Sequence, residues 1–208
     1  MSALLKSLKH AMAALAIGGG ATLGLAASGT ALAESRPVIF VGNNWDGTVN
    51  VFDSTSYAKI GLINAGPDKR ARMTEILLNP IKLTAFQAVR NLIGEGNDQL
   101  VDDMYSSNDG RLLIASRPSF ADVVAIDIAT GKVVWRFVVD GYRSDHMALS
   151  PDGTKVAVSA STGNVGHVLD VNTGKQVGKF KSGNSPHENV YSKAGSKLSH
   201  ASIGFVFT

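Results

Sequence analysis

The sequence predicts an all-β fold built from repeated sheets of four short strands, and three observations support this prediction. Three segments superpose without gaps on Gly110, Gly153 and Gly195, which lie 43 and 42 residues apart. Each segment has the pattern of a strand, a tight turn and a second strand. A second half-motif, "VVAIDIATGKVVWRF" around Asp127, recurs 43 residues later as "VGHVLDVNTGKQVGKF" around Asp170. A period in the low forties with four strands per unit is typical of β-propellers.

Each unit is expected to contain four strands, and the third repeat shows them in order. Here "MALS" is the predicted innermost strand and "PDG" a tight turn, in which Pro151 fixes φ and Gly153 accepts a positive φ. The alternating "KVAVSAS" predicts the second strand, "GHVLDV" the third, "NTGK" a hairpin turn and "QVGKFKSG" the outermost strand. A single blade cannot bury both of its apolar faces, so the blades are expected to stack around a common axis.

The repeats predict about three to three and a half blades. Blade 1 spans 37–66 without an innermost strand, blade 2 spans 101–141, blade 3 spans 144–183, and a partial blade 4 spans 186–208. Propellers usually close with four to eight blades. We therefore expect a truncated propeller or an incomplete fragment. The alternative is a compact half-propeller that self-associates through its open blade edges.

An insertion at 67–98 interrupts the β pattern after blade 1. Its apolar residues recur at helical spacing in two runs, which Pro80 separates, and Gly94 can end the second run. The runs are Met73, Ile76 and Leu77, then Phe86, Val89 and Ile93. This pattern predicts a helix-Pro-helix insertion, either a lid or partner-docking element over the channel or a packing plug on the exposed side of blade 1. The basic cluster of Lys69, Arg70 and Arg72 is interpreted as a solvated helix start, or as a group that attracts an anionic ligand.

Residues 1–33 have the pattern of a signal peptide. Lys6 and Lys9 precede an Ala/Leu/Ile/Gly-rich run, and "ALA" at 31–33 matches the small-x-small pattern that signal peptidase recognises. No Arg-Arg pair precedes the run, so we expect export by the general secretion route, cleavage after Ala33, and a location outside the cell or in the cell envelope. The alternative is an uncleaved membrane anchor, which the glycines at 18–20 disfavour. After cleavage no transmembrane span is expected.

Composition excludes several classes of function. The 208 residues include no cysteine, so disulfides and thiolate metal sites are excluded. The formal net charge of +3 falls to +1 beyond residue 33, because the leader holds two basic residues and no acidic one. No basic stripe predicts nucleic-acid binding. There is no G-x-S-x-G elbow and no glycine-rich phosphate loop between a strand and a helix, so neither a serine hydrolase nor a nucleotide site is predicted.

The segments "SPDGTKVAVS" and "VLDVNTGKQVGKF" resemble the bacterial YVTN-type β-propeller repeat, over roughly 37–208 apart from the insertion. The resemblance implies the wider superfamily that contains lactonase-like and quinoprotein amine dehydrogenase β-chain-like propellers. It implies the fold but no single function, because this fold carries binding modules and several unrelated enzymes. A WD-repeat is the weaker alternative, because "NWDG" at 44–47 precedes a third strand and no Gly-His partner motif stands before it.

Polar pairs stand directly before the predicted innermost strands, in register with the repeat. Equivalent positions of successive blades lie on one ring, so these side chains are expected to converge on one rim of the central channel. The predicted ligand-binding residues are Asp102, Asp103, Asp145, His146, His187 and Glu188, with Asn189 next to the last pair and His200 in the following strand. Carboxylates and imidazoles can hold a divalent metal, the one cofactor that the sequence leaves open. The alternative is that they only satisfy backbone groups and neighbouring blades.

Other prominent side chains have structural interpretations. His167 is expected to be a hydrogen-bonded structural group, and Trp135 and Phe137 to fill the core between blades. No catalytic residue is assigned. The predicted function is an exported, non-catalytic propeller that binds a protein, a peptide or a small molecule. The alternative is a fragment of a lactonase-like or quinoprotein dehydrogenase-like enzyme with a metal or cofactor at the channel mouth.

Overall fold

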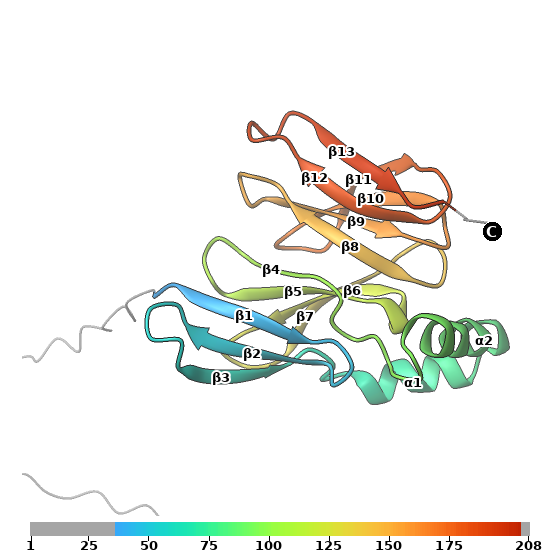
Figure 1. Cartoon of the computed structure of the whole chain (residues 1–208), viewed down its shortest axis with the longest axis horizontal. Helices are drawn as coiled ribbons and strands as arrows, with labels where there is room; N and C mark the ends of the chain where they lie inside the picture. Colours follow the sequence, from blue (N-terminus) through green and yellow to red (C-terminus); the bar gives the residue numbers. More distant parts are fainter. Residues whose placement is uncertain (1–35, 205–208) are drawn as a thin grey trace, which may run out of the picture. The chain divides into compact units, whose positions relative to one another are not determined.

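The structure is a computed structural model that describes residues 36–204. The predicted signal peptide lies outside the described residues. Four antiparallel sheets follow one another along the chain, each next to its successor (Figure 1). Their strands are β1 (Val38–Asn43), β2 (Thr48–Asp53) and β3 (Lys59–Asn64); β4 (Met104–Ser106), β5 (Leu112–Arg117), β6 (Asp122–Asp127) and β7 (Val133–Val138); β8 (Ser144–Leu149), β9 (Lys155–Ala160), β10 (Val165–Asp170) and β11 (Gln176–Lys181); and β12 (Pro186–Tyr191) and β13 (Leu198–Ser202). These three-, four-, four- and two-stranded sheets confirm the predicted fold class, a partial β-propeller. We refer to them as blades 1 to 4.

The sheets share one register, which identifies the equivalent strands. Asp53, Asp127 and Asp170 end strands β2, β6 and β10 and lie opposite Val38, Leu112 and Lys155. Strand β1 is therefore equivalent to β5 and β9, the second strands of blades 2 and 3. Among the described residues, blade 1 has no counterpart of the inner strands β4 and β8.

The two repeated turn motifs owe their shape to one aspartate each. In "SPDG" the Asp152 carboxylate accepts hydrogen bonds from the Ser150 and Thr154 hydroxyls, and Gly153 adopts a φ of +67°. In "DVNTG" the Asp170 carboxylate accepts bonds from the backbone N–H and the hydroxyl of Thr173. The second turn recurs with the same aspartate bonds at Asp53 in blade 1 and at Asp127 in blade 2.

The core lies between neighbouring blades. Apolar side chains of β5, β6, β8, β9 and β10 fill the space between blades 2 and 3, and a second cluster joins blades 1 and 2. The Trp135 side chain is only 8% exposed, and its Nε1 donates a hydrogen bond of 2.9 Å to the Val171 carbonyl of the next blade. The Phe137 ring packs edge-on against His167, with centroids 5.0 Å apart. Both aromatic side chains thus belong to the core between blades.

His167 is buried and has a hydrogen-bond partner on each ring nitrogen. Its Nε2 accepts a bond of 3.1 Å from the Asp140 backbone N–H, so Nδ1 carries the proton and bonds Gln176 Oε1 at 2.7 Å. Burial lowers the pKa of His167 and favours this neutral form. The residue is structural.

The insertion folds as the predicted helix-Pro-helix. Helix α1 (Lys69–Leu77) is followed by α2 (Pro80–Ala88), which continues into one π-helical turn, η1 (Val89–Ile93). The Asn79 side chain caps α2 by accepting the backbone N–H groups of Ile81 and Lys82, and Pro80 occupies the first helical turn, where no N–H partner is needed. Gly94 follows η1, as the sequence predicts.

The insertion packs on blade 2. Ile76 and Phe86 of the helices form a small core with Leu100 and with Phe120 of the β5–β6 connection. Arg117, at the end of β5, is fully buried and donates hydrogen bonds to the carboxylates of Asp122 and Asp68, the residue before α1. The insertion is thus anchored at the end of blade 2 rather than on the open side of blade 1. Leu77 is 62% exposed and lies outside this core, although its spacing matches the apolar run.

The basic cluster at the start of α1 is largely engaged by acidic side chains. Lys69 Nζ lies 3.0 Å from Asp98, and Arg72 contacts both Asp68 and Glu75 at 3.1 and 2.6 Å. These pairs favour the interpretation as a helix start over an anion site. No helix within residues 36–204 is long and apolar enough to cross a membrane.

Candidate functional site

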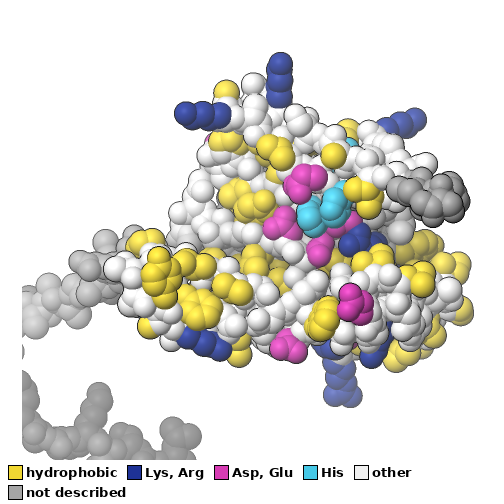
Figure 2. All heavy atoms as spheres, in the orientation of Figure 1, with side chains coloured by type: hydrophobic (Ala, Val, Ile, Leu, Met, Phe, Trp, Pro, Cys, Tyr) yellow, Lys and Arg dark blue, Asp and Glu magenta, His cyan; other side chains and the backbone are white. Residues whose placement is uncertain are grey.

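The inner strands β4, β8 and β12 all begin at the same end of their blades, which we call the inner-strand face. The insertion lies at this end as well, because it follows β3. Figure 2 shows histidine side chains in the middle of the molecule with acidic side chains around them. Asp102, Asp145, His146 and His187 lie close together at this end, and we call them the Asp/His cluster.

Two β-bulges explain why the side chains of consecutive residues reach the Asp/His cluster. Ser144 pairs with Ala160 and Met147 with Val158, so β8 has one residue more than β9 across this interval. In blade 4, Pro186 pairs with Ser202 and Asn189 with His200, which is the same irregularity. Side chains of a regular strand alternate between its two faces, and a bulge breaks that alternation. Asp145 and His146 can therefore both take part in the cluster.

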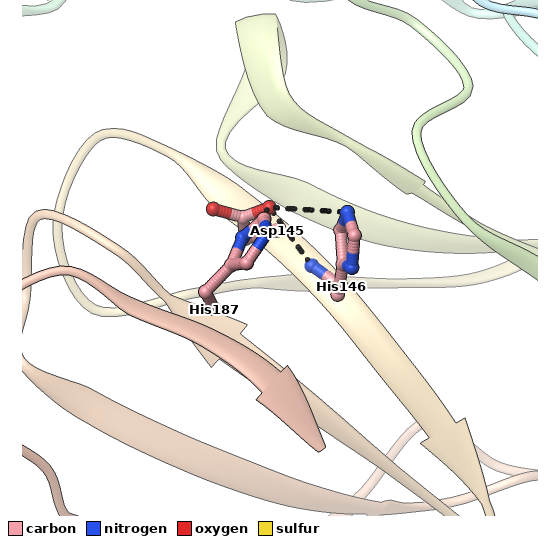
Figure 3. A group of neighbouring side chains, drawn as sticks. All are labelled: Asp145, His146 and His187. Carbon is pink, nitrogen blue, oxygen red and sulfur yellow. Dashed lines mark hydrogen bonds and ion pairs between the residues drawn. The ribbon is translucent and has the colours of Figure 1, made fainter. Parts of the chain in front are cut away.

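Asp145 is the buried centre of the cluster, with a side-chain exposure of 1%. Its Oδ2 accepts hydrogen bonds from Arg143 and from the Ser161 hydroxyl. Its Oδ1 lies 3.3 Å from His187 Nδ1 and faces the His146 ring (Figure 3). Burial alone raises the pKa of Asp145, but the guanidinium and the hydroxyl on Oδ2 reverse this effect and lower it.

His146 lies between carboxylates on both sides. Its Nδ1 is 3.0 Å from Glu188 Oε2, while its Nε2 is 4.0 Å from Asp102 Oδ2 and 4.0 Å from Asp145 Oδ1. Burial opposes the charged imidazole, but the bond to Glu188 and the nearby aspartates outweigh it, so the pKa of His146 is raised. The His146 and His187 rings lie against each other, with centroids 4.1 Å apart.

Asp102 closes the cluster from blade 2. Burial and the neighbouring charge of Asp145 raise the pKa of Asp102 to about 6. Within the described part of the chain, Asp102 Oδ2 and His187 Nδ1 are buried atoms without a hydrogen-bond partner.

Three of the predicted rim residues bond the framework instead. The Asp103 carboxylate accepts the backbone N–H groups of Met104 and Met147 at 2.8 and 2.9 Å, which joins two inner strands. Asn189 is buried and donates to the His146 carbonyl at 3.0 Å. His200 Nδ1 is 2.9 Å from the Asn189 amide oxygen, and its Nε2 faces Ser182 at the start of the β11–β12 connection. Glu188 takes part only through its bond to His146.

A hollow with a volume of about 390 Å³ opens beside Asp145. Its lining comes from blades 3 and 4 and from the end of the insertion: Ile93, Arg143, Asp145, Ser161, Thr162, Asn164, Ser185 and Ile203. The sequence reasoning missed Arg143 and Ser161. Their equivalents in the neighbouring repeats are other residue types, such as Pro118 and Ile203 for Ser161, so the repeat alignment contains no signal for them.

The cluster and the hollow together offer ionisable groups next to a space for a ligand. Carboxylate and imidazole donors from three blades can hold a cation, exchange protons, or bind a polar group of a ligand.

Comparison with known proteins supports the fold only. No protein-family model matches the sequence, and no curated protein matches it. Among solved structures, the chain is similar to the hydrazine synthase of Kuenenia stuttgartiensis, with 25% identity over 48% of this chain and 28% of that chain and a TM-score of 0.43. It is also similar to a chain of a mitotic checkpoint complex, with 14% identity over 81% of this chain and 44% of that chain and a TM-score of 0.56. The chain spans less than half the length of either one, and the second likeness shows a propeller-type fold.

Proposed function

We propose that the chain is an exported, non-catalytic β-propeller module with YVTN-type repeats that binds a protein, a peptide or a small molecule through its inner-strand face. One observation carries this proposal. Asp102, Asp145 and His187 occupy equivalent positions of three consecutive blades and meet beside a hollow that the framework does not fill. Polar groups that converge on a concave surface are the usual composition of a ligand site.

The insertion supports the same face. Its last turn contributes Ile93 to the hollow, while its first helix is anchored to blade 2 through Asp68. Insertions between repeats collect on one face, which is often the binding face. The insertion is thus suited to act as a wall or lid of the ligand site, and its apolar residue can contact the less polar part of a ligand.

A second candidate function is that of a propeller enzyme with a metal or cofactor at the channel mouth. The grouping of Asp145, His146 and His187 favours it, because these are common metal-binding and proton-transferring side chains. Turnover separates the two candidates. Hydrolysis of a lactone or oxidation of an amine that is lost in Asp145→Asn supports the enzyme, whereas ligand binding without turnover supports the module.

Single-cysteine cross-linking tests the binding proposal, because the chain has no cysteine of its own. Thr162→Cys places a photoreactive maleimide at the hollow, and Asn172→Cys places the same reagent on an exposed turn at the opposite end of blade 3. Each labelled protein is irradiated with the envelope and medium fractions of the source cells, and the adducts are identified by mass spectrometry. We expect a discrete adduct at position 162 that is absent at position 172. Equal adducts at both positions, or none at 162, contradict the proposal.

Intact mass spectrometry tests export. The mature protein is expected in the envelope or the medium, with Glu34 as its first residue. A cell-bound product that retains the first 33 residues supports the membrane-anchor alternative instead.

A further inference from the structure

We propose that Asp145, His146 and His187, with Asp102 as the fourth ligand, form a binding site for a divalent transition-metal ion, with Zn²⁺ and Mn²⁺ as the probes that test it. The inference shares the inner-strand face with the proposed function and gives that face a specific chemistry. It does not require the module to have a protein partner.

The donor atoms lie nearly at coordination distance from one another. Asp145 Oδ1 and His187 Nδ1 are 3.3 Å apart, and His146 Nε2 is 4.0 Å from Asp145 Oδ1. All three lie within 4.8 Å of one another. Ligands at 2.0–2.2 Å from a tetrahedral zinc ion stand roughly 3.3–3.6 Å apart. The first pair already meets this spacing, and the half-exposed His146 ring closes the remainder by a side-chain rotation.

Asp102 completes the set from the neighbouring blade. Its Oδ2 lies 4.0 Å from His146 Nε2 and is a buried acceptor with no hydrogen-bond partner within the described residues. A buried polar atom without a partner is costly, so native structures rarely leave one unless a water, proton or ion satisfies it. His187 Nδ1 is also a buried atom without a hydrogen-bond partner within the described residues, and it lies 3.3 Å from Asp145 Oδ1. A bound cation satisfies both atoms at once.

Neighbouring side chains hydrogen-bond the proposed ligands and orient them, as residues behind the ligands do in metal sites. Glu188 faces His146 Nδ1 at 3.0 Å, so this nitrogen holds the proton and Nε2 turns its lone pair toward Asp102 and Asp145. A carboxylate behind a metal-binding imidazole is the usual arrangement. On the other side, Arg143 and Ser161 engage Asp145 Oδ2, while Oδ1 accepts the His146 backbone N–H at 3.0 Å and keeps a lone pair for the ion.

The charges also call for a cation. Without one, the Nε2 lone pair of His146 faces two carboxylate oxygens, and within residues 36–204 only one guanidinium, that of Arg143, lies against the cluster. Burial and the charge of Asp145 make ionised Asp102 unfavourable by itself. A proton can relieve this repulsion in part, but a divalent ion pairs with both carboxylates and with both imidazoles. Two imidazole donors favour zinc, manganese or iron over calcium, which prefers oxygen ligands.

Metal titration of the full secreted chain tests the inference. The protein is stripped with EDTA and titrated with ZnCl₂, and separately with MnCl₂, by isothermal calorimetry, and the bound metal is counted by mass spectrometry after dialysis. We expect one ion per chain. Asp145→Asn and His187→Gln each remove one ligand and should abolish binding or weaken it by more than about 100-fold. Glu188→Gln keeps all four ligands and should weaken binding about 10- to 100-fold.

Asp152→Asn is the matched control, because it makes the same carboxylate-to-amide change in an exposed turn at the other end of blade 3. It should bind metal as the wild type does. Circular dichroism of each metal-free variant establishes that the fold is kept, and the more exposed His187 provides a variant if Asp145→Asn does not fold. The inference is wrong if the wild type binds neither ion, or if the folded His187→Gln protein binds them as tightly as the wild type does.

The outcome is separable from that of the cross-linking experiment. Metal binding without a site-specific adduct at position 162 rejects the module and keeps the metal site. A site-specific adduct on a protein that binds no metal rejects the metal site and keeps the module.

Discussion

Replacing Arg117 by methionine should strongly destabilise the protein. The Arg117 guanidinium donates hydrogen bonds of 2.8 and 2.9 Å to Asp122, of 3.2 Å to the Ala65 carbonyl and of 3.3 Å or less to Asp68. Both Arg117 and Asp122 have fully buried side chains. Methionine keeps much of the side-chain volume but leaves the Asp122 carboxylate buried with less compensation.

Removing one partner of a buried ion pair typically costs about 3–5 kcal/mol. Arg136 also contacts Asp122 and remains in place, so we expect the lower end of this range, about 3 kcal/mol. For a domain of this size, that loss lowers the melting temperature by roughly 6–12 °C. The double variant Arg117→Met/Asp122→Asn should recover part of the loss, because residue 122 is then neutral, while Arg136 still contacts Glu75 and Asp68 still contacts Arg72.

Urea unfolding followed by circular dichroism measures the effect. Arg111→Met is the control, because Arg111 forms only half-exposed pairs with Asp109 and Asp127, and its midpoint should match that of the wild type. Hydrogen exchange of the α1 and α2 amides should increase in Arg117→Met, since Asp68 then loses its anchor. An Arg117→Met protein whose midpoint equals that of Arg111→Met would refute the view that this ion pair anchors the insertion.

Three further predictions concern pH, a glycine and an open edge. The pKa of Asp68 is lowered, because its bonds to Arg117 outweigh the effect of burial. The stability that ionised Asp68 contributes is therefore present above the ordinary pKa of 3.8 and is lost as the pH falls through the lower folded value. Between about pH 5 and about pH 3, the urea midpoint should fall less in Asp68→Asn than in the wild type. Gly174→Ala should be about 1–3 kcal/mol less stable than Gly131→Ala in urea unfolding. Both glycines have φ near +67°, but only a Cβ at 174 would lie 2.5 Å from the Trp135 ring. Equal losses of stability would contradict this packing. Strand β1 pairs only with β2 among the described strands, and its Val41 side chain is exposed. Sedimentation velocity should therefore detect concentration-dependent dimers, and Val41→Lys should reduce them. A strictly monomeric wild type would contradict self-association through this edge.

The sequence predicts the fold well because its signals are local and repeated. The side chains of Asp152 and Asp170 shape their own turns, so the motifs "SPDG" and "DVNTG" identify a blade without knowledge of its neighbours. The helix-Pro-helix insertion is predictable for the same reason, since Asn79 and Pro80 define the start of α2 by themselves. The face on which the insertion packs depends on Arg117, whose partners are distant in sequence, and the spacing of apolar residues does not reveal it.

The candidate site is predictable only in outline. The repeat register places all the polar pairs at one end of the inner strands, but it cannot distinguish His146, which faces the cluster, from its equivalent Asp103, which bonds two backbone N–H groups. That difference follows from the bulges and from contacts between blades. Asn189 and His200 have the chemistry of ligands, yet they bond each other and the framework.

The position of Trp135 allows the interface between blades 2 and 3 to be followed by tryptophan fluorescence. The chain has two tryptophans, and Trp45 is 53% exposed in the β1–β2 turn, whereas Trp135 is buried against the next blade. A Trp45→Phe protein therefore carries a single emitter whose fluorescence wavelength depends on whether the two blades are in contact. Any separation of the two blades should shift the emission to the red before the strands themselves unfold. Opening of this interface and loss of secondary structure can therefore be followed in the same sample.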